Sequence, residues 1–169
     1  MEARSSLLRA WRFLRKQPGM ENLSIGFGAF ECGVRESAVI RGETTISAED
    51  YCSGKRYPDA VCNSFYPIDL HDSSQGIVQQ HLGAGTVPQV PLRALVPSGS
   101  KLFLAAGRCI SSDRLANSAL RVQATSMATA QAAGAASAAS IRCGTALLMT
   151  PMENIRKILQ EHGAILPAE

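Results

Sequence analysis

The alternation of hydrophobic and polar positions along this chain predicts a mixture of strands and helices. Residues 101–106 form a short apolar run that ends at Gly107, as is typical of a buried strand in a parallel sheet. From Arg121 to Ala139 the chain is rich in alanine, which favours a closely packed helix. A strand, a loop and a helix in this order direct first-turn N–H groups at a negatively charged or electron-rich ligand.

The start of the chain predicts an amphipathic helix over Met1–Lys16, which Pro18 and Gly19 end. Its arginines also resemble those of a transit peptide, but the early Glu2 favours a docked surface helix, because transit segments contain few acids. Two further strands are expected, and they cover Leu23–Phe30 and Val34–Arg41.

The middle and the end of the chain carry further helix, strand and loop patterns. Ser47, with Asp50 three residues later, predicts a short capped helix that Gly54 ends. Thr150–Glu153 predicts a capping box, and the helix after it has a stripe of Ile155, Ile158 and Leu159 that stops at Gly163. The segments between these helices are expected to be extended over Asp59–Leu70 and Val90–Val96, with a mobile loop over His71–Val87.

Composition excludes several classes of protein. The net charge of +3 is small and the basic residues are spread out, which argues against nucleic-acid binding. The chain has no apolar run of about 18 residues, so we expect no transmembrane helix. The 5 cysteines are widely spaced without a C-x-x-C pair, which predicts reduced thiols in a cytoplasmic protein and no metal site.

Several motifs resemble one family in both sequence and order. The helix region carries AGRCIS at Ala106–Ser111, SALRV at Ser118–Val122 and QAAGAA at Gln131–Ala136. Further landmarks are GVRE at Gly33–Glu36, residues Pro58–Val61, YPIDLH at Tyr66–His71 and VPLRALVP at Val90–Pro97. The chain thereby resembles the C-terminal portion of the FAD-dependent oxidoreductase family related to the glutathione reductase-type flavoproteins.

The resemblance implies an FAD site around the start of the alanine-rich helix. Gly107 would let the backbone approach the pyrophosphate or ribityl chain, or it serves only a tight turn. Arg108 would pair with a phosphate or a carboxylate, or it forms a salt bridge elsewhere. The helix start would face the flavin ring and favour its reduced form, or it is an ordinary buried helix. The residues implied at this helix start are Ser118, Arg121, Val122 and Thr125.

Three residues are candidates for catalysis on the substrate side. Arg35 suits a carboxylate-bearing substrate, and Asp69 with His71 could supply a proton acceptor. The two side chains point to the same face of a strand, so the alternative is that they bond to each other or to neighbouring backbone. Some relatives carry an iron–sulfur cluster, but the cysteine spacing here does not support one. Cys109 is either a low-pKa thiol or an inert buried one.

A G-x-G-x-x-G dinucleotide motif is missing, since neither Gly26–Gly28 nor Gly83–Gly85 has the third glycine. We therefore expect an α+β or α/β chain that contains only part of a doubly wound FAD-binding domain. Residues 1–88 would form a β-rich substrate-side region, 89–141 the C-terminal part of the FAD-binding domain and 142–169 a closing helix.

Two functions fit this sequence, and both leave the small-molecule substrate unknown. In the first, the chain is the C-terminal part of an FAD-dependent oxidoreductase that transfers hydride or electrons and needs an N-terminal FAD-binding half or self-association. In the second, it is a non-catalytic remnant or a regulatory binding module.

Overall fold

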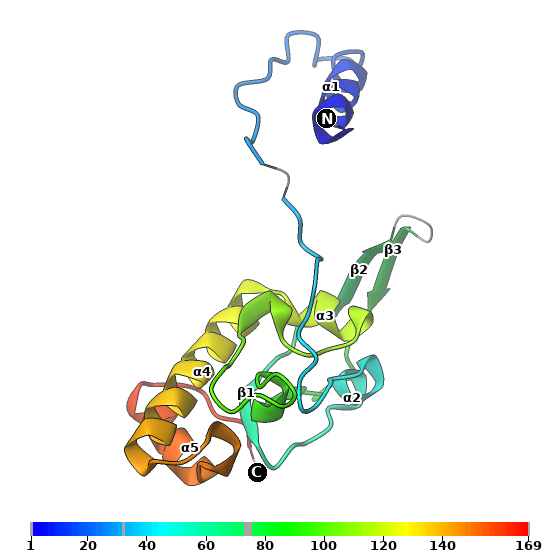
Figure 1. The fold of residues 1–169 in the computed structure, drawn as a ribbon. Helices are drawn as coiled ribbons and strands as arrows, with labels where there is room; N and C mark the ends of the chain where they lie inside the picture. Colours follow the sequence, from blue (N-terminus) through cyan, green and yellow to red (C-terminus); the bar gives the residue numbers. More distant parts are fainter. Residues whose placement is uncertain (1, 32, 73–75, 169) are drawn as a thin grey trace. The chain divides into compact units, whose positions relative to one another are not determined.

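The computed structural model describes residues 2–31, 33–72 and 76–168, which divide into a small unit up to Val34 and a large unit from Arg35 onward. The order of elements along the chain is shown in Figure 1. The helices are α1 (Glu2–Leu14), α2 (Ala48–Ser53), α3 (Arg114–Leu120), α4 (Gln123–Cys143) and α5 (Met152–Glu161). The strands are β1 (Ala60–Asn63), β2 (Ile68–Asp72), β3 (Gly76–Gln80) and β4 (Gln89–Pro91). Short 3-10 turns lie at Leu92–Ala94, Gly107–Cys109 and Leu147–Met149.

The small unit consists of α1 and an extended segment. The indole N–H of Trp11 donates to the Leu23 carbonyl at 3.0 Å, and the Arg15 guanidinium lies over the Trp11 ring. No residue of α1 is buried. The predicted helix at Met1–Lys16 is therefore confirmed over Glu2–Leu14, whereas the predicted strand at Leu23–Phe30 is wrong, because no strand among the described residues pairs with it.

The large unit contains two antiparallel two-stranded sheets, in which β1 pairs with β4 and β2 pairs with β3. Helix α4 packs against β1 and α5, whereas α3 packs against β2 (Figure 1). Small alanine side chains on α4 allow this close approach, and Ala132, Ala136 and Ala139 are buried in the same cluster as Ile155 and Leu159 of α5. The α+β class expected from the sequence is confirmed.

Helix α2 forms as its sequence predicts. The Ser47 hydroxyl accepts the Asp50 N–H at 3.0 Å, and Gly54 ends the helix in the left-handed conformation. The capping box predicted before α5 is wrong, because Pro151 is the residue that precedes that helix and the Thr150 hydroxyl donates to the Ala146 carbonyl instead. The helix itself and its buried Ile155 and Leu159 are confirmed.

A single carboxylate joins α2 and α3. Oδ1 of Asp113 accepts the Ala116 N–H of α3, and Oδ2 accepts the Ala48 N–H of α2, both at 2.7 Å. The Asp113 N–H in turn donates to the Ile46 carbonyl at 2.9 Å. The N-termini of the two helices are therefore held at one point.

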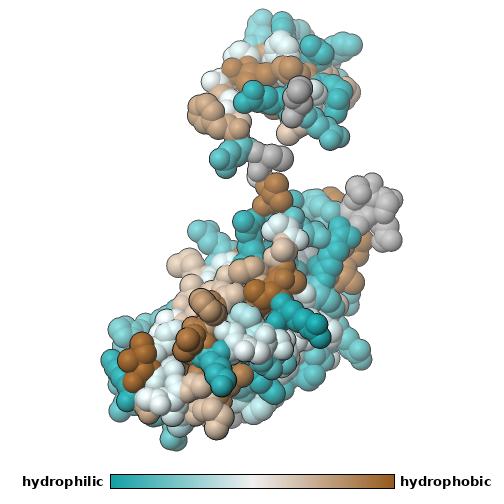
Figure 2. Space-filling model, viewed as in Figure 1, coloured by the Kyte–Doolittle hydropathy of each residue, from teal (hydrophilic) through white to brown (hydrophobic). Residues whose placement is uncertain are grey.

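The central strand predicted at residues 101–106 is not formed. A strand needs a neighbour for its N–H and C=O groups, and no strand of the described residues lies beside this segment. Leu102 and Phe103 are 86% and 72% exposed, and Ala105 N–H donates to the carbonyl of Leu95. Hydrophobic side chains are also visible on the surface of this unit in Figure 2.

Other predicted boundaries shift as well. The helix predicted over Arg121–Ala139 becomes α4, which begins at Gln123 and ends at Cys143. Residues 34–41 are extended but form no strand, and the loop predicted over His71–Val87 contains β3, with 73–75 outside the described residues. The predicted run Val90–Val96 holds only the end of β4 and then a 3-10 turn.

Candidate functional site

Four residues singled out from the sequence meet where α3 lies against β2. The Asp69 N–H donates to the Ser118 hydroxyl at 3.1 Å, and that hydroxyl donates to the Leu115 carbonyl at 2.6 Å. The Arg121 guanidinium donates to the Asp69 carbonyl at 3.1 Å. His71 Nε2 lies 3.6 Å from Asp69 Oδ2. The structure thus unites two residues predicted for catalysis with two predicted for cofactor binding.

Glu36 forms ion pairs with two arginines beside this contact. Glu36 forms an ion pair with the Arg114 Nε atom, and its other carboxylate oxygen lies 3.8 Å from an Arg121 Nη atom. The Arg121 side chain is only 8% exposed, whereas that of Arg114 is 53% exposed. We call Glu36, Asp69, His71, Arg114 and Arg121 the polar cluster. Sequence reasoning missed Arg114 and Glu36 as site residues, although Glu36 belongs to the GVRE motif.

Arg35 stays outside the polar cluster. Its side chain is exposed, and no hydrogen bond or ion pair joins it to another described residue. The structure therefore does not bring together the three residues predicted for catalysis.

A cleft of about 740 Å³ lies at the beginning of α4. Its walls are mostly apolar and come from β1 and the segment after it, the first turns of α4 and the chain that follows α5. Val122 and Thr125, both predicted from the sequence, line it together with Gln123 and Ala124. Val122 precedes the helix and provides no side-chain cap, so a ligand in the cleft could accept hydrogen bonds from the first-turn N–H groups.

A chain of hydrogen-bonded hydroxyl groups connects Tyr51 and Ser64 to Thr125, which lines the cleft. Tyr51 O–H donates to the Tyr66 carbonyl at 2.7 Å, so its oxygen accepts the Ser64 O–H at 2.9 Å. Ser64 has then used its only proton, so its oxygen accepts the Thr125 O–H at 3.1 Å. Burial raises the pKa of Tyr51, which keeps this phenol protonated. Tyr51 and Ser64 carried no recognisable signal in the sequence.

Gly107 contacts α4 through its backbone. Its φ of +78° favours glycine, and its N–H donates to the Thr129 hydroxyl at 3.0 Å. A Cβ at this position would lie 3.7 Å from Ser126. The side chain of Arg108 is exposed, and its carbonyl accepts a hydrogen bond from the Asn117 amide at 3.0 Å. Gly107 therefore contacts α4 at Ser126 and Thr129, and none of these three residues lines the cleft.

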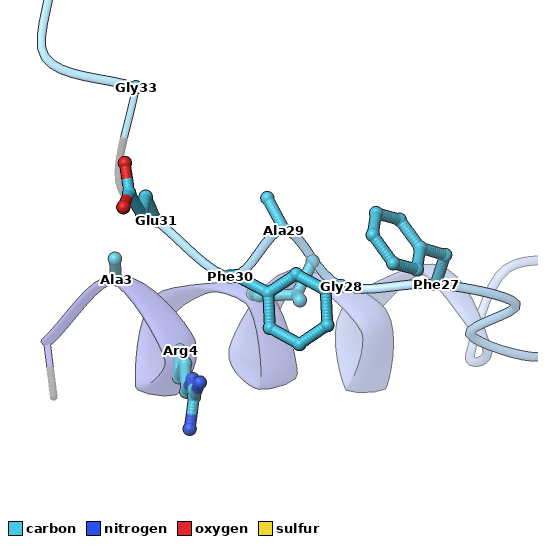
Figure 3. A pocket seen from close by; sticks show the side chains of 9 residues that line it. Ala3, Arg4, Phe27, Gly28, Ala29, Phe30, Glu31 and Gly33 are labelled. Atoms are coloured by element: carbon cyan, nitrogen blue, oxygen red, sulfur yellow. The ribbon is translucent and has the colours of Figure 1, made fainter.

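The small unit has a hollow of its own, of about 570 Å³ (Figure 3). Phe27 and Phe30 lie along it with their rings edge to face at 6.0 Å, and Arg4 and Glu31 are its charged residues. None of the residues predicted for binding or catalysis lines it. We assign it no function.

The cysteines among the described residues form no disulfide. Cys52, Cys62, Cys109 and Cys143 are free, and Cys32 lies outside the described residues. No group of His, Cys, Asp or Glu within the described ranges could hold a metal ion, so an iron–sulfur cluster has no support there. No helix in the same ranges is long and apolar enough to cross a bilayer.

Comparison with known sequences decides the family. The family model FAD dependent oxidoreductase matches residues 1–159, which include the polar cluster and the part of the cleft that precedes Gly163. The chain belongs to the FAD-dependent oxidoreductase family. Searches of the curated proteins and of the solved structures return no match.

The residues at the start of α4 fit the cofactor of an FAD-dependent oxidoreductase in part. A flat ring with electron-rich carbonyl groups suits a cleft that has apolar walls and uncapped helix N–H groups at one end. The glycine motif that holds a dinucleotide pyrophosphate is absent from the sequence. The cleft thus has features that suit the ring of the family's cofactor, whereas the sequence lacks the motif that holds its phosphates.

Proposed function

We propose that this chain supplies the flavin-closing and substrate-side part of an FAD-dependent oxidoreductase of the glutathione reductase type. The observation that carries the proposal is the cleft at the start of α4, with Val122 and Thr125 at its edge and uncapped helix N–H groups beside them. FAD, when bound, accepts the electrons that the substrate loses. The residues of this chain bind, orient and exchange protons around it.

Each part of the site has a role in this proposal. The first turn of α4 stabilises negative charge on the flavin ring, because Gln123, Ala124 and Thr125 of that turn line the cleft and the helix has no side-chain cap. Thr125, held by Ser64, fixes the edge of the cleft. Gly107 holds the preceding loop close to α4, and Arg108 lies beside it to meet a phosphate or a carboxylate. In the polar cluster, His71 accepts a proton and Asp69 orients it.

The proposal includes a partner for the phosphate end of FAD. The segment 101–106 exposes Leu102 and Phe103, as an inner strand of a doubly wound sheet would do without its neighbours. We infer that an N-terminal FAD-binding half supplies those strands and the glycine motif. Residues 89–141 then complete the doubly wound domain, residues 1–88 form the substrate side, and 142–169 close the molecule.

The experiment is a titration of the purified chain with FAD, followed by flavin fluorescence and absorbance, with and without an N-terminal half from the same family. We expect weak binding by the chain alone and tight stoichiometric binding with the half. Ala124→Pro removes an N–H from the first turn of α4 and should weaken the binding, whereas Ala130→Ser on an exposed part of the same helix should not. Tight binding of FAD by the chain alone would show that the site does not require an N-terminal half.

A non-catalytic module is the second candidate, and the exposed Leu102 and Phe103 also suit it, since a protein partner could cover them. Absence of FAD binding in both arms of the titration would favour this candidate. Binding of a hydrophobic dye that the N-terminal half does not suppress would support it further.

A further inference from the structure

Two arginines of the polar cluster converge on one carboxylate. Glu36 contacts Arg114 through one oxygen and Arg121 through the other. Guanidinium groups offer several N–H donors in one plane, which matches the two oxygens of a carboxylate. Arg114 and Arg121 therefore form a seat for a carboxylate, and here a residue of the chain itself occupies it.

Arg121 is fixed more firmly than the other two members of this ion-pair group, since the side chains of Glu36 and Arg114 are 34% and 53% exposed. Arg121 is almost buried and is held by the Asp69 carbonyl, and Arg114 begins α3, whose N-terminus is fixed by Asp113. Glu36 instead lies in an exposed extended stretch that covers residues 35–39. The next backbone hydrogen bond along this stretch is from Ile40 N–H to the Cys109 carbonyl at 2.8 Å. A partly exposed ion pair on such a segment is easily exchanged for another.

We propose that Arg114 and Arg121 bind the carboxylate of a small-molecule substrate, and that Glu36 occupies their site until the substrate displaces it. The partly exposed Asp69 and His71 join the seat through the bond from Arg121 to the Asp69 carbonyl. A bound carboxylate would thus place the rest of its molecule near a group that can accept a proton. This assignment deepens the proposed oxidoreductase function by naming the substrate class as carboxylates, and it rests on that function for calling the ligand a substrate.

The test uses glutarate, which resembles the glutamate side chain, with its dimethyl ester as an uncharged probe. Binding to the full chain is followed by backbone amide shifts in NMR, without FAD. Glu36→Gln should bind glutarate about fivefold tighter than the original chain, because the competing carboxylate has lost its charge. Glu49→Gln makes the same change in net charge at an exposed site on α2 and should leave the affinity unchanged. The ester should not bind to any of them.

A second substitution tests the seat itself. In the Glu36→Gln background, Arg114→Gln should abolish the gain in affinity, and Arg114→Lys should retain only part of it because lysine lacks the planar fork. Equal glutarate affinity of Glu36→Gln and Glu49→Gln would overturn the proposal, as would a gain that survives Arg114→Gln. The glutarate experiment contains no FAD, so its result does not depend on the result of the FAD titration. Failure of the carboxylate proposal can therefore be distinguished from failure of the proposed oxidoreductase function.

Discussion

Two glycines of the large unit, Gly42 and Gly134, should respond to alanine in opposite ways. A Cβ at Gly42 would lie 2.7 Å from Ser111 Cβ and 3.1 Å from the Arg93 carbonyl oxygen. Gly42→Ala should therefore lower the free energy of unfolding by about 1–3 kcal/mol through overpacking. A Cβ at Gly134 in α4 would have no heavy atom within 4 Å apart from the adjacent residues and backbone of its own helix, so Gly134→Ala should raise the free energy of unfolding by about 0.5–1 kcal/mol. Urea denaturation of both variants measures this contrast, and an equal effect at the two positions would contradict it.

The thiol of Cys62 should make stability depend on pH. Burial raises its pKa from 9.0 to about 12, because the thiolate loses its hydration. Above pH 9 the unfolded chain therefore releases a proton that the folded chain keeps, and the stabilisation present at lower pH is lost between pH 9 and 12. The chain should lose about 1 kcal/mol more per pH unit than Cys62→Ala over this interval.

Urea unfolding of both proteins at pH 8, 9 and 10 measures the difference, and the variant corrects for other groups that ionise there. Thiol labelling at pH 8 provides a control, since the exposed Cys143 should react and Cys62 should not. Parallel pH profiles of the two proteins would contradict the assignment.

The sequence predicted residues of the site better than their arrangement. Asp69 and His71 share a strand face as predicted, because this relation follows from the local period of two. The contacts of Ser118 and Arg121 with Asp69 join positions about 50 residues apart, and no local pattern encodes them. Tyr51 and Ser64 were missed for the same reason, since they acquire their role only when α2, β1 and α4 meet.

Elements α2, β1 and α4 are coupled by the hydroxyl chain of Tyr51, Ser64 and Thr125. Ser64→Ala would leave the Thr125 O–H without its acceptor and Tyr51 without a donor, and we expect a loss of about 1–3 kcal/mol in unfolding free energy. Adding Thr125→Val to Ser64→Ala should recover part of the loss, because the stranded donor is then gone.

Calorimetry or urea unfolding of the single and double variants completes this cycle. Ser137→Ala is the matched control on α4, since that hydroxyl only donates to the Ala133 carbonyl of its own helix. Additive effects of Ser64→Ala and Thr125→Val would show that the chain of hydroxyl groups is not coupled.

At the scale of elements, the sequence predicted helices whose caps and apolar faces depend on nearby residues. It did not predict which extended segments would pair as strands. The cap of α2 uses residues within one turn, and the apolar stripe of α5 is a helical period, so both could be read directly. The run at 101–106 has the composition of an inner strand, yet a strand forms only when a neighbour takes up its hydrogen bonds. Strand β3 was missed because its five residues, GIVQQ, lie within a polar stretch.

At the scale of the whole molecule, all residues of the hydrophobic core belong to the large unit, and the first of them is Ile46. A chain of residues 35–169 should therefore fold alone and unfold cooperatively, with a free energy within about 1 kcal/mol of the full chain. Urea unfolding followed by circular dichroism compares the two. A broad, uncooperative transition of the shorter chain would show that residues 1–34 contribute to the core.

Asp113 couples the local unfolding of α2 to that of α3, because its carboxylate accepts a hydrogen bond from each helix. Because one carboxylate holds the first N–H of α2 and an N–H in the first turn of α3, a movement of Asp113 loosens both helices at that end. Local fluctuations should then expose Ala48 and Ala116 together, as one cooperative unit. Hydrogen exchange of these two amides should report one shared opening free energy, and Asp113→Ala should accelerate both. Substitutions that favour one helix would thereby protect the other, although 65 residues separate Ala48 from Asp113.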